Sequence, residues 1–277
     1  MPKSENTKIS SELARLQRRI IGCTSCPRLV KYREEVARTR RRMYASDIYW
    51  GKPLPGFGDP AAGLLILGLA PAAHGGNRTG RMFTGDRSGD FLFRALYEAG
   101  FANQPESRHR GDGLELRNCF ITASLRCAPP ANKPLPEELL NCRPYLETEF
   151  RLLRNMRAVL VLGRIAFDSF LRLVYQSRLF QPAESRDSAK AGRKAEAGRR
   201  NAGSLADTLP GRSSLQFGHG LSYDLGDRVP RLFCSFHPSQ QNTQTGKLTL
   251  EMLRRVLDDI RIFLGFDRSG RDAPLGQ

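Results

Sequence analysis

The sequence predicts an α/β fold in which a four-stranded parallel sheet carries helices on both faces. Two observations predict this fold: four short apolar runs that are typical of buried strands, and helical patterns between them. Strands that alternate with helices pair in parallel. The 277 residues, 40% of them hydrophobic, suffice for a large core. We expect one domain over residues 1–277.

Each expected strand is a run rich in Leu, Ile, Val or Phe that ends in turn residues, as strands covered on both faces do. In chain order the runs are Leu64–Gly68, Cys119–Thr122, Ala158–Gly163 and Leu232–Phe236.

Helical spacing of apolar residues accounts for the segments between and after the strands. Ser88–Ala99 stops at Gly100, a residue that favours a helix end. Pro136–Met156 begins with Pro-Glu-Glu, which places acidic side chains at the positive end of the helix. The other two expected helices are Ile165–Tyr175 and Thr249–Phe263.

The segment 176–214 departs from this pattern. It is rich in Ala, Gly, Ser and Arg and has almost no apolar periodicity, so we predict a flexible basic insertion. A solvated linker is the default interpretation of such a segment, and non-specific contact with nucleic acid is the alternative.

The charge balance is strongly basic, with 44 Lys and Arg against 28 Asp and Glu and a formal net charge of +16. Such a balance favours a polyanionic partner, because neutralised phosphates release counterions; a charged insertion in an otherwise ordinary soluble protein is the alternative. No run approaches the ~20 apolar residues of a membrane span, and the first residues lack the apolar core of a secretion signal. We expect a cytoplasmic protein.

Six cysteines in a reducing compartment indicate metal binding or reactivity rather than disulfides. Two pairs stand out, at 23–26 and 127–142, and four thiolates can bind zinc or an iron–sulfur cluster. Their spacing leaves both open, together with unrelated core cysteines. Cys119 and Cys234 lie in expected strands and are more typical of core residues. The candidate ligands are Cys23, Cys26, Cys127 and Cys142.

Ligands of parallel sheets bind beyond the carboxyl ends of the strands, which nominates the loops 69–87, 123–133 and 237–247. The glycines of the first loop allow its backbone to approach a ligand and to offer N–H groups. Its side chains add donors, an aromatic face and a carboxylate, yet it matches neither a Walker loop nor the dinucleotide fingerprint. The chemistry-bearing residues of this loop are His74, Asn77, Arg81, Phe83 and Asp86.

Each of these residues also has a plain structural interpretation. Phe83 can anchor the loop in the core, and Asp86 can cap the helix that follows it. His237, at the end of the fourth strand, can be structural as solitary histidines often are. Its expected position on the same rim as the first loop favours function.

Several segments together carry a resemblance to a known family. They are CTSCPRLV, PGFGDP, GLAPAAHGGNRTGRMFTGDRSG, LRCAPPANKPLPEELLNCRP, VLGRIAF and FHPSQQNTQTGKLT. In these segments the chain resembles the iron–sulfur uracil-DNA glycosylases, and specifically family 5. The resemblance covers the chain except its amino terminus, the basic insertion and the last dozen residues.

The resemblance implies a three-layer α/β/α sandwich and a structural [4Fe-4S] cluster on Cys23, Cys26, Cys127 and Cys142. It also implies monofunctional release of uracil from DNA to leave an abasic site, with a substrate range that extends to hypoxanthine and xanthine. We expect a monomer that acts on duplex DNA at the bacterial nucleoid.

The chain departs from the related family 4 at two positions. Where that family has an acidic residue in its first motif and an Asn in its second, this chain has Leu69 and Ala123. We expect Asp86 and Asn132 to take over these tasks. A pocket without a dedicated uracil-reading amide would discriminate less among bases.

The expected mechanism extrudes the target nucleotide from the stack. Phe83 would stack on the base, His237 would stabilise the charge of the leaving base, and Asp86 would orient water or stabilise the sugar cation, while Asn132 would position the water or the base. Loop groups would bind the edge of the base, and those expected to do so are Ala72, His74, Gly75 and Asn77.

A non-enzymatic iron–sulfur DNA-binding factor fits the charge and the cysteines equally well. An electron carrier is the third candidate function, and it is disfavoured because nothing in the chain suggests a partner cofactor. The glycine-rich loop with Phe83 and Asp86, expected to face His237, favours the enzyme.

Overall fold

The computed structural model describes residues 3–180 and 209–266. Within them a six-stranded sheet has the order β1-β3-β2-β4-β6-β5. Its four central strands pair in parallel, and the two edge strands are antiparallel. The strands are β1 Phe57–Gly58, β2 Leu64–Gly68, β3 Cys119–Ala123, β4 Ala158–Leu162, β5 Ser222–Tyr223 and β6 Arg231–Ser235.

The predicted four-stranded parallel sheet is therefore right at the centre and incomplete at the edges. β1 and β5 have two residues each, too few for an alternating pattern to be recognised in the sequence. The four central strands lie within one or two residues of their predicted bounds, because runs of buried Leu, Ile and Val mark them clearly.

The helices surround this sheet. The helix α5 ends at Leu152, four residues before its predicted end, because the next residue, Leu153, has a φ of −81° and a ψ of 72° that leave the helical region. The helices are α1 Lys3–Ile21, α2 Pro27–Thr39, α3 Gly76–Thr79, α4 Arg87–Glu98, α5 Pro136–Leu152, α6 Arg164–Gln176, α8 Gln240–Gln244 and α9 Leu250–Leu264.

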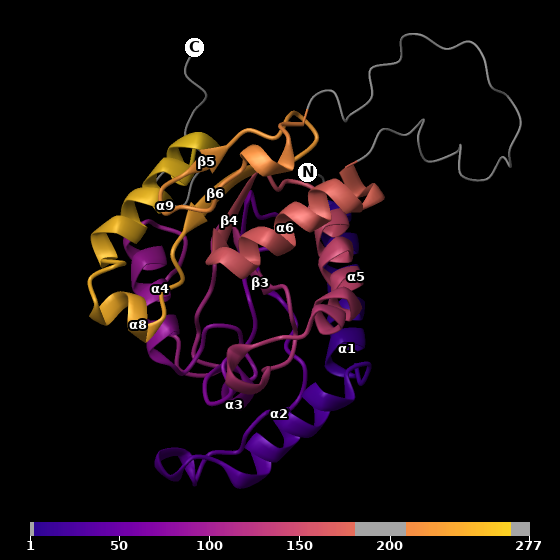
Figure 1. Cartoon of the computed structure of the whole chain (residues 1–277), viewed down its shortest axis with the longest axis vertical. Coiled ribbons are helices and arrows are strands. Elements are labelled where there is room, and N and C mark those ends of the chain that lie inside the picture. Colours follow the sequence, from indigo (N-terminus) through magenta and orange to yellow (C-terminus); the bar gives the residue numbers. More distant parts are fainter. Residues whose placement is uncertain (1–2, 181–208, 267–277) are drawn as a thin grey trace, which may run out of the picture.

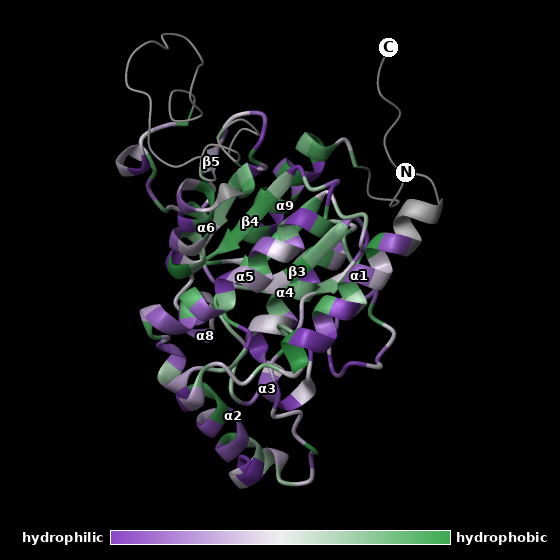
Figure 2. Ribbon diagram, turned by 90° about the vertical axis from the view of Figure 1, so that its right-hand side faces the viewer, coloured by the Kyte–Doolittle hydropathy of each residue, from purple (hydrophilic) through white to green (hydrophobic). Residues whose placement is uncertain are grey.

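Alternate residues of the strands fill two separate cores. Leu64 and Ile66 of β2 pack with α4 and α9 on one face, and Leu65 and Leu67 pack with α1, α5 and α6 on the other. Figure 1 shows the sheet between these two helical layers, and Figure 2 shows green strands inside helices with purple outer sides. The three-layer α/β/α sandwich is confirmed.

The predicted insertion at 176–214 is described only at its two ends, since residues 181–208 lie outside the described part of the chain. On one side Arg178–Phe180 forms a 3-10 turn, and on the other Arg212–Ser214 forms a second. The hydroxyl of Tyr175 donates to the carbonyl of Pro210, which ties the two ends together. Over residues 3–180 and 209–266, no helix has the length and apolarity that crossing a membrane requires.

Candidate active site

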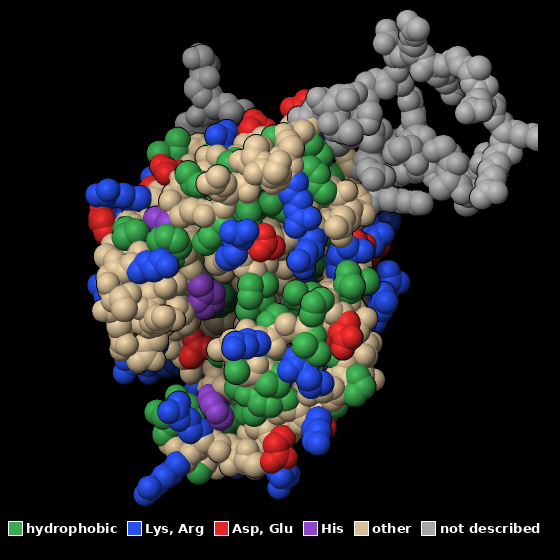
Figure 3. Space-filling view, in the orientation of Figure 1, with side chains coloured by type: hydrophobic (Ala, Val, Ile, Leu, Met, Phe, Trp, Pro, Cys, Tyr) green, Lys and Arg blue, Asp and Glu red, His purple; other side chains and the backbone are tan. Residues whose placement is uncertain are grey.

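The loops at the carboxyl edge of the sheet surround a hollow of about 600 Å³. The loop after β2 contributes most of its wall, the loop after β3 and α8 contribute further parts, and α2 with the loop that follows it closes one side. Figure 3 shows a recess flanked by a histidine and an acidic side chain. Of the predicted site residues, those that line the hollow are Ala72, His74, Gly75, Asp86 and Asn132.

Asp86 both lines the hollow and caps a helix. Its Oδ1 accepts the backbone N–H of Gly89 at 2.9 Å, as the N-cap of α4. Its other oxygen, Oδ2, packs so tightly on Gly75 that a Cβ there would lie 1.9 Å away. Burial raises the pKa of the Asp86 carboxyl above its usual value, against the opposing effect of the Gly89 N–H. The cap and a catalytic role are therefore compatible in this residue.

Phe83 is wedged against backbone. Its ring lies on Gly68, where a Cβ would be 2.9 Å from Cζ, and its carbonyl oxygen lies against Gly89. The backbone of Phe83 has a φ of 51°, a left-handed conformation that costs a non-glycine residue of order 1–3 kcal/mol. Because its backbone is strained and its ring is packed on Gly68, Phe83 is held in one position near the start of α4.

The ring of His237 lies beside that of Phe83, with centroids 5.8 Å apart and planes inclined by 31°. The two residues come from the loops after β6 and β2, so two distant segments meet here, although neither ring lines the hollow itself. The side chain of Asn242 donates to the carbonyl of His237 at 2.8 Å. Burial lowers the pKa of His237 to about 4, so its imidazole is neutral at pH 7.

The four candidate cysteine ligands converge beside this site. Cys127 and Cys142 are buried in one cluster, and Cys26 packs against it. Cys23 lies near enough to Cys127 to affect its pKa. Burial raises the pKa of Cys127 to about 11 and that of Cys142 to about 12, so both stay protonated unless a metal replaces the proton.

Donors around the sulfurs suit an anionic group. Arg33 is 4% exposed; its Nη1 donates to the Cys127 sulfur at 3.1 Å, and its Nε has no hydrogen-bond partner in the described part of the chain. Asn141 donates to the Cys26 sulfur at 3.5 Å. A buried cation with a spare donor fits thiolates bound to a metal cluster.

As they stand, however, no three His, Cys, Asp or Glu side chains among the described residues are arranged to hold a metal ion. A single zinc ion, with Zn–S bonds of about 2.3 Å, would require the four sulfurs to lie within roughly 4 Å of one another. A four-iron cluster is likewise held by four thiolates. The four thiols and the buried Arg33 beside them suit an anionic metal–thiolate group of either kind.

Comparisons with known proteins identify the family of this chain. Residues 55–261 match the model of the uracil DNA glycosylase superfamily. A type-5 uracil-DNA glycosylase of Mycobacterium tuberculosis is 43% identical over 259 residues, which cover 93% of this chain and 84% of that protein. One of Thermus thermophilus is 44% identical over 247 residues, which cover 89% and 95% of the two chains.

The chain belongs to the type-5 uracil-DNA glycosylase family. A type-4 uracil-DNA glycosylase of Pyrobaculum aerophilum is more distant, at 31% identity over 59% of this chain and 66% of that protein. The resemblance inferred from the motifs is thereby confirmed.

One histidine of the hollow, His74, is held by Tyr49, and the sequence did not reveal this contact. Tyr49, 8% exposed, places its hydroxyl 3.0 Å from Nδ1 of His74 and accepts the backbone N–H of Arg41 at 3.4 Å. If the hydroxyl donates its one hydrogen to Nδ1, the proton of the neutral ring is on Nε2. Burial, with Arg41 and Arg78 nearby, lowers the pKa of His74 and favours that neutral form.

The structure corrects the expectation that Gly75 and Asn77, in the loop after β2, bind the edge of the base. The N–H groups of Gly75 and Asn77 both donate to the carbonyl of Ala72, at 3.3 and 3.0 Å. The side-chain amide of Asn77 is fully buried and donates to the carbonyl of Arg33. In this conformation these donors stabilise the loop and are not directed at a base, a constraint that loop composition alone cannot show.

Asn132 lines the hollow from an exposed turn in the loop after β3. It and Ala131 have φ values of 57° and 52°, a left-handed pair that Asn adopts more readily than most residues. Arg81, by contrast, is engaged in a buried ion pair with Asp112 at 2.6 Å, so this predicted donor supports the loop.

Sequence reasoning missed the side of the hollow formed by Tyr32, Arg41, Met43 and Tyr44. The available signal was the mixture of aromatic and basic residues in RRRMYASDIYWGK. No motif in that segment points to a partner, so its contact with the first loop could not be foreseen.

Proposed function

We propose that this chain is a DNA-repair hydrolase that cleaves the N-glycosidic bond of uracil in DNA and leaves an abasic site. The observation that carries the proposal is the hollow at the carboxyl edge of the sheet. Asp86, His74 and Asn132 all line it. Its volume of about 600 Å³ is in the range of pockets that enclose small ligands.

The target nucleotide would leave the stack at a cost of a few kcal/mol, enter this hollow and reach the ring pair of Phe83 and His237, which lies outside the lining of the hollow in this conformation. Phe83 would stack on the base or hold His237 in place, since the two rings are neighbours. As the C1′–N bond breaks, its electron pair moves onto the base. The neutral His237 would donate a hydrogen bond to the carbonyl that gathers this charge.

Asp86 would act on the other product of bond cleavage. Its carboxylate would orient a water toward C1′ and stabilise the cationic sugar. The water oxygen then bonds to C1′, and one water proton goes to the departing base, so that the products are neutral base and abasic sugar. Asn132, which also lines the hollow, would position the water or the base.

We further propose that the substrates include hypoxanthine and xanthine. The residue at the end of β3 is the buried Ala123, so no amide side chain at this position would select uracil. A base-release panel of uracil, hypoxanthine and xanthine in duplex DNA tests this range. Release of uracil alone would contradict it.

Cys23, Cys26, Cys127 and Cys142 would hold a [4Fe-4S] cluster, which when bound would supply structural cross-linking. Support comes from the convergence of the thiols and the buried Arg33 beside them. This group would tie the start of α2 to the loop after β3 and to α5, next to one wall of the hollow.

We propose that the protein acts as a cytoplasmic monomer on duplex DNA at the nucleoid, in keeping with its net charge of +16.

The direct test incubates the protein with duplex DNA containing one uracil, followed by hot alkali, which breaks the strand at abasic sites. We expect breakage at the uracil, with a single-turnover rate that falls at least about tenfold in His237→Ala while DNA binding is retained. The matched control is His219→Ala, since His219 packs on Phe236 outside the hollow. Binding without breakage would favour a non-enzymatic DNA-binding factor.

A further inference from the structure

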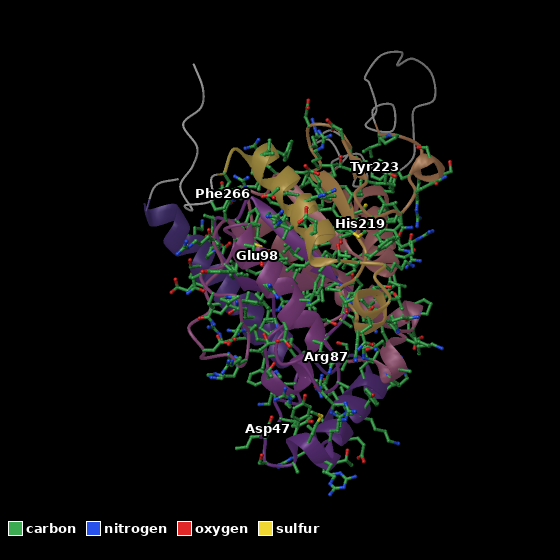
Figure 4. All side chains as sticks on the ribbon, turned by 90° about the vertical axis from the view of Figure 1, so that its left-hand side faces the viewer. Asp47, Arg87, Glu98, His219, Tyr223 and Phe266 are labelled. Atoms are coloured by element: carbon green, nitrogen blue, oxygen red, sulfur yellow. The ribbon has the colours of Figure 1, made fainter. Side chains whose placement is uncertain are left out.

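A second cavity lies at the amino edge of the sheet, and we call it the amino-edge pocket. Its volume is about 490 Å³, and its walls include the segment 153–157 before β4, the segment 224–230 before β6 and the end of α9. Because β4 and β6 are parallel, both begin at the edge opposite the candidate active site. Figure 4 shows Tyr223, the residue before the second of these segments, at the upper end of the molecule, and Arg87, which lines the active-site hollow, in its lower half.

Arginines dominate the rim of the amino-edge pocket. Five of them line it, against two aspartates. Arg228 is exposed and Arg231 is half-buried, and neither forms an ion pair within residues 3–180 and 209–266. Guanidinium groups of this kind attract anions and bind carboxylates through two parallel hydrogen bonds. The lining arginines are Arg151, Arg154, Arg157, Arg228 and Arg231.

Contacts with α9 hold part of this rim in place. Arg157 donates to the carbonyls of Phe263 and Leu264 at 3.2 and 3.3 Å. The guanidinium groups of Arg157 and Arg231 lie 5.3 and 5.5 Å from the ring centroid of Phe263. Two of the five cations are therefore positioned before a ligand arrives, which lowers the entropy cost of binding.

The floor of the amino-edge pocket is apolar. The rings of Phe150 and Phe180 are buried there and meet edge to face, with centroids 5.9 Å apart. An apolar floor below a basic rim suits a ligand that carries both a large apolar group and negative charges. The apolar lining residues besides these rings and Phe263 are Leu153, Met156, Leu179, Val229 and Pro230.

Two features favour a peptide over a nucleic acid as this ligand. Single-stranded nucleic acids stack their bases on open aromatic faces, but Phe150 and Phe180 are each only 7% exposed, and two guanidinium groups already lie over the ring of Phe263. The exposed Asp224 and Asp227 also line the pocket and would repel a continuous row of phosphates. A peptide can place its carboxylates selectively beside the arginines.

We propose that the amino-edge pocket binds an acidic peptide segment of a partner protein, in which Asp or Glu residues flank one large apolar side chain. The apolar side chain enters the floor beside Val229, and the flanking carboxylates pair with Arg228 and Arg231. The chain's own segment 181–208 is a poor occupant, because it has six Lys and Arg against four Asp and Glu. Since the pocket and the active-site hollow lie at opposite edges of the sheet, the partner and DNA can be bound together.

The test measures binding of a fluorescein-labelled octapeptide, in which acidic residues flank one phenylalanine, to the full chain by fluorescence anisotropy. We expect a dissociation constant of roughly 10–100 μM, and a value at least about tenfold higher for Arg228→Glu. Arg117→Glu is the matched control, since Arg117 is exposed just before β3 at the same edge of the sheet and does not line the pocket. This variant has the same net charge and should bind within about twofold of normal. Thermal unfolding should be unchanged in both variants.

Two altered peptides test the two parts of the pocket without changing the protein. Replacing the phenylalanine by serine should weaken binding at least about tenfold, and replacing the acidic residues by their amides should abolish it. No binding of the original peptide at about 1 mM, or equal binding of the serine peptide, would overturn the proposal. Equal losses in Arg228→Glu and Arg117→Glu would also overturn it, because binding would then follow net charge alone.

A nucleic-acid arm and an activity arm complete the experiment. Affinity for a short oligothymidylate should be the same in Arg228→Glu and Arg117→Glu, and a selective loss in Arg228→Glu would assign the pocket to nucleic acid and overturn the peptide. Uracil excision by Arg228→Glu should stay within about twofold of normal. A chain that binds the peptide but releases no uracil would contradict the proposed function and leave the pocket standing, whereas uracil release without peptide binding would overturn only the pocket.

Discussion

The hollow and the cysteine centre share the segment between β3 and α5, yet they are completed in different ways. In and beside the hollow, close approaches between side chains and glycine backbone fix Asp86 on Gly75 and Phe83 on Gly68. In the cysteine centre, the Nε of the buried Arg33 has no hydrogen-bond partner among the described residues, and burial raises the pKa of the neighbouring Cys127 thiol. The chain alone therefore completes the hollow, whereas the cysteine centre has donors and ligands that a further group would satisfy.

The largest difference between the two regions should appear when a cysteine is truncated. We expect Cys127→Ala to lose all bound iron and the brown colour of the purified protein, and to lower the unfolding temperature by roughly 5–10 °C. Cys234→Ala is the control, since Cys234 is also buried but lies in β6. Iron content, visible absorbance and thermal unfolding are measured together. A colourless protein with stoichiometric zinc, or full iron in Cys127→Ala, would contradict the cluster.

The hollow should be most sensitive at its glycine contacts. Gly75→Ala would place a Cβ 1.9 Å from Oδ2 of Asp86, so the carboxylate must move, and we expect single-turnover excision to fall at least about tenfold. Gly111→Ala, where the nearest atom is 3.8 Å from the added Cβ, should leave the rate unchanged. Iron content should stay normal in both variants, and a Gly75→Ala protein with a normal rate would show that the position of Asp86 is not critical.

The pH dependence of excision tests the expected protonation states of Asp86 and His237. Asp86 must be ionised to act, and burial raises its pKa above 3.8, so activity should fall as the pH drops through that raised value. The pKa of His237 is lowered to about 4 from 6.5, so the ring stays neutral and the rate should show no step near pH 6.5. A step there that disappears in His237→Ala would contradict a buried neutral imidazole.

The smallest effect is expected at the tyrosine behind His74. Tyr49→Phe removes the hydroxyl that lies 3.0 Å from Nδ1 and frees the ring to change tautomer, so excision should slow about threefold. Tyr97→Phe, on the exposed side of α4, is the control. If His74→Ala and the double variant Tyr49→Phe/His74→Ala lose the same fraction of the excision rate, Tyr49 acts through His74. If the losses of the two single variants add in the double variant, it does not.

The sequence predicted those parts of the molecule that local pattern determines. The central strands follow from runs of apolar residues, and the meeting of Asp86 with Asn132 follows from the rule that loops at the carboxyl edge share one rim. The family motifs supplied the roles of these residues, which stay proposals.

Partnerships between distant segments could not be predicted in the same way. Nothing in the spacing of Tyr49 indicates that its hydroxyl meets His74, and nothing in the first loop indicates that the amide of Asn77 is directed at Arg33. The role of Arg78 as the link between the loop after α2 and the hollow likewise depends on three contacts that arise only on folding. Two-residue edge strands escape notice because their pairing depends on a neighbour and not on their own composition.

The central claim is that the carboxylate of Asp86, presented by the hollow, performs the chemistry of base release. The most direct measurement is single-turnover uracil excision by Asp86→Asn, which keeps an N-cap acceptor for α4 but removes the charge. Thr249→Ala is the control, because Thr249 caps α9 and its loss costs about 1 kcal/mol of stability without touching the hollow. We predict a rate at least about tenfold lower in Asp86→Asn, with unchanged DNA binding, and a normal rate in Thr249→Ala. A normal rate in Asp86→Asn would contradict the account.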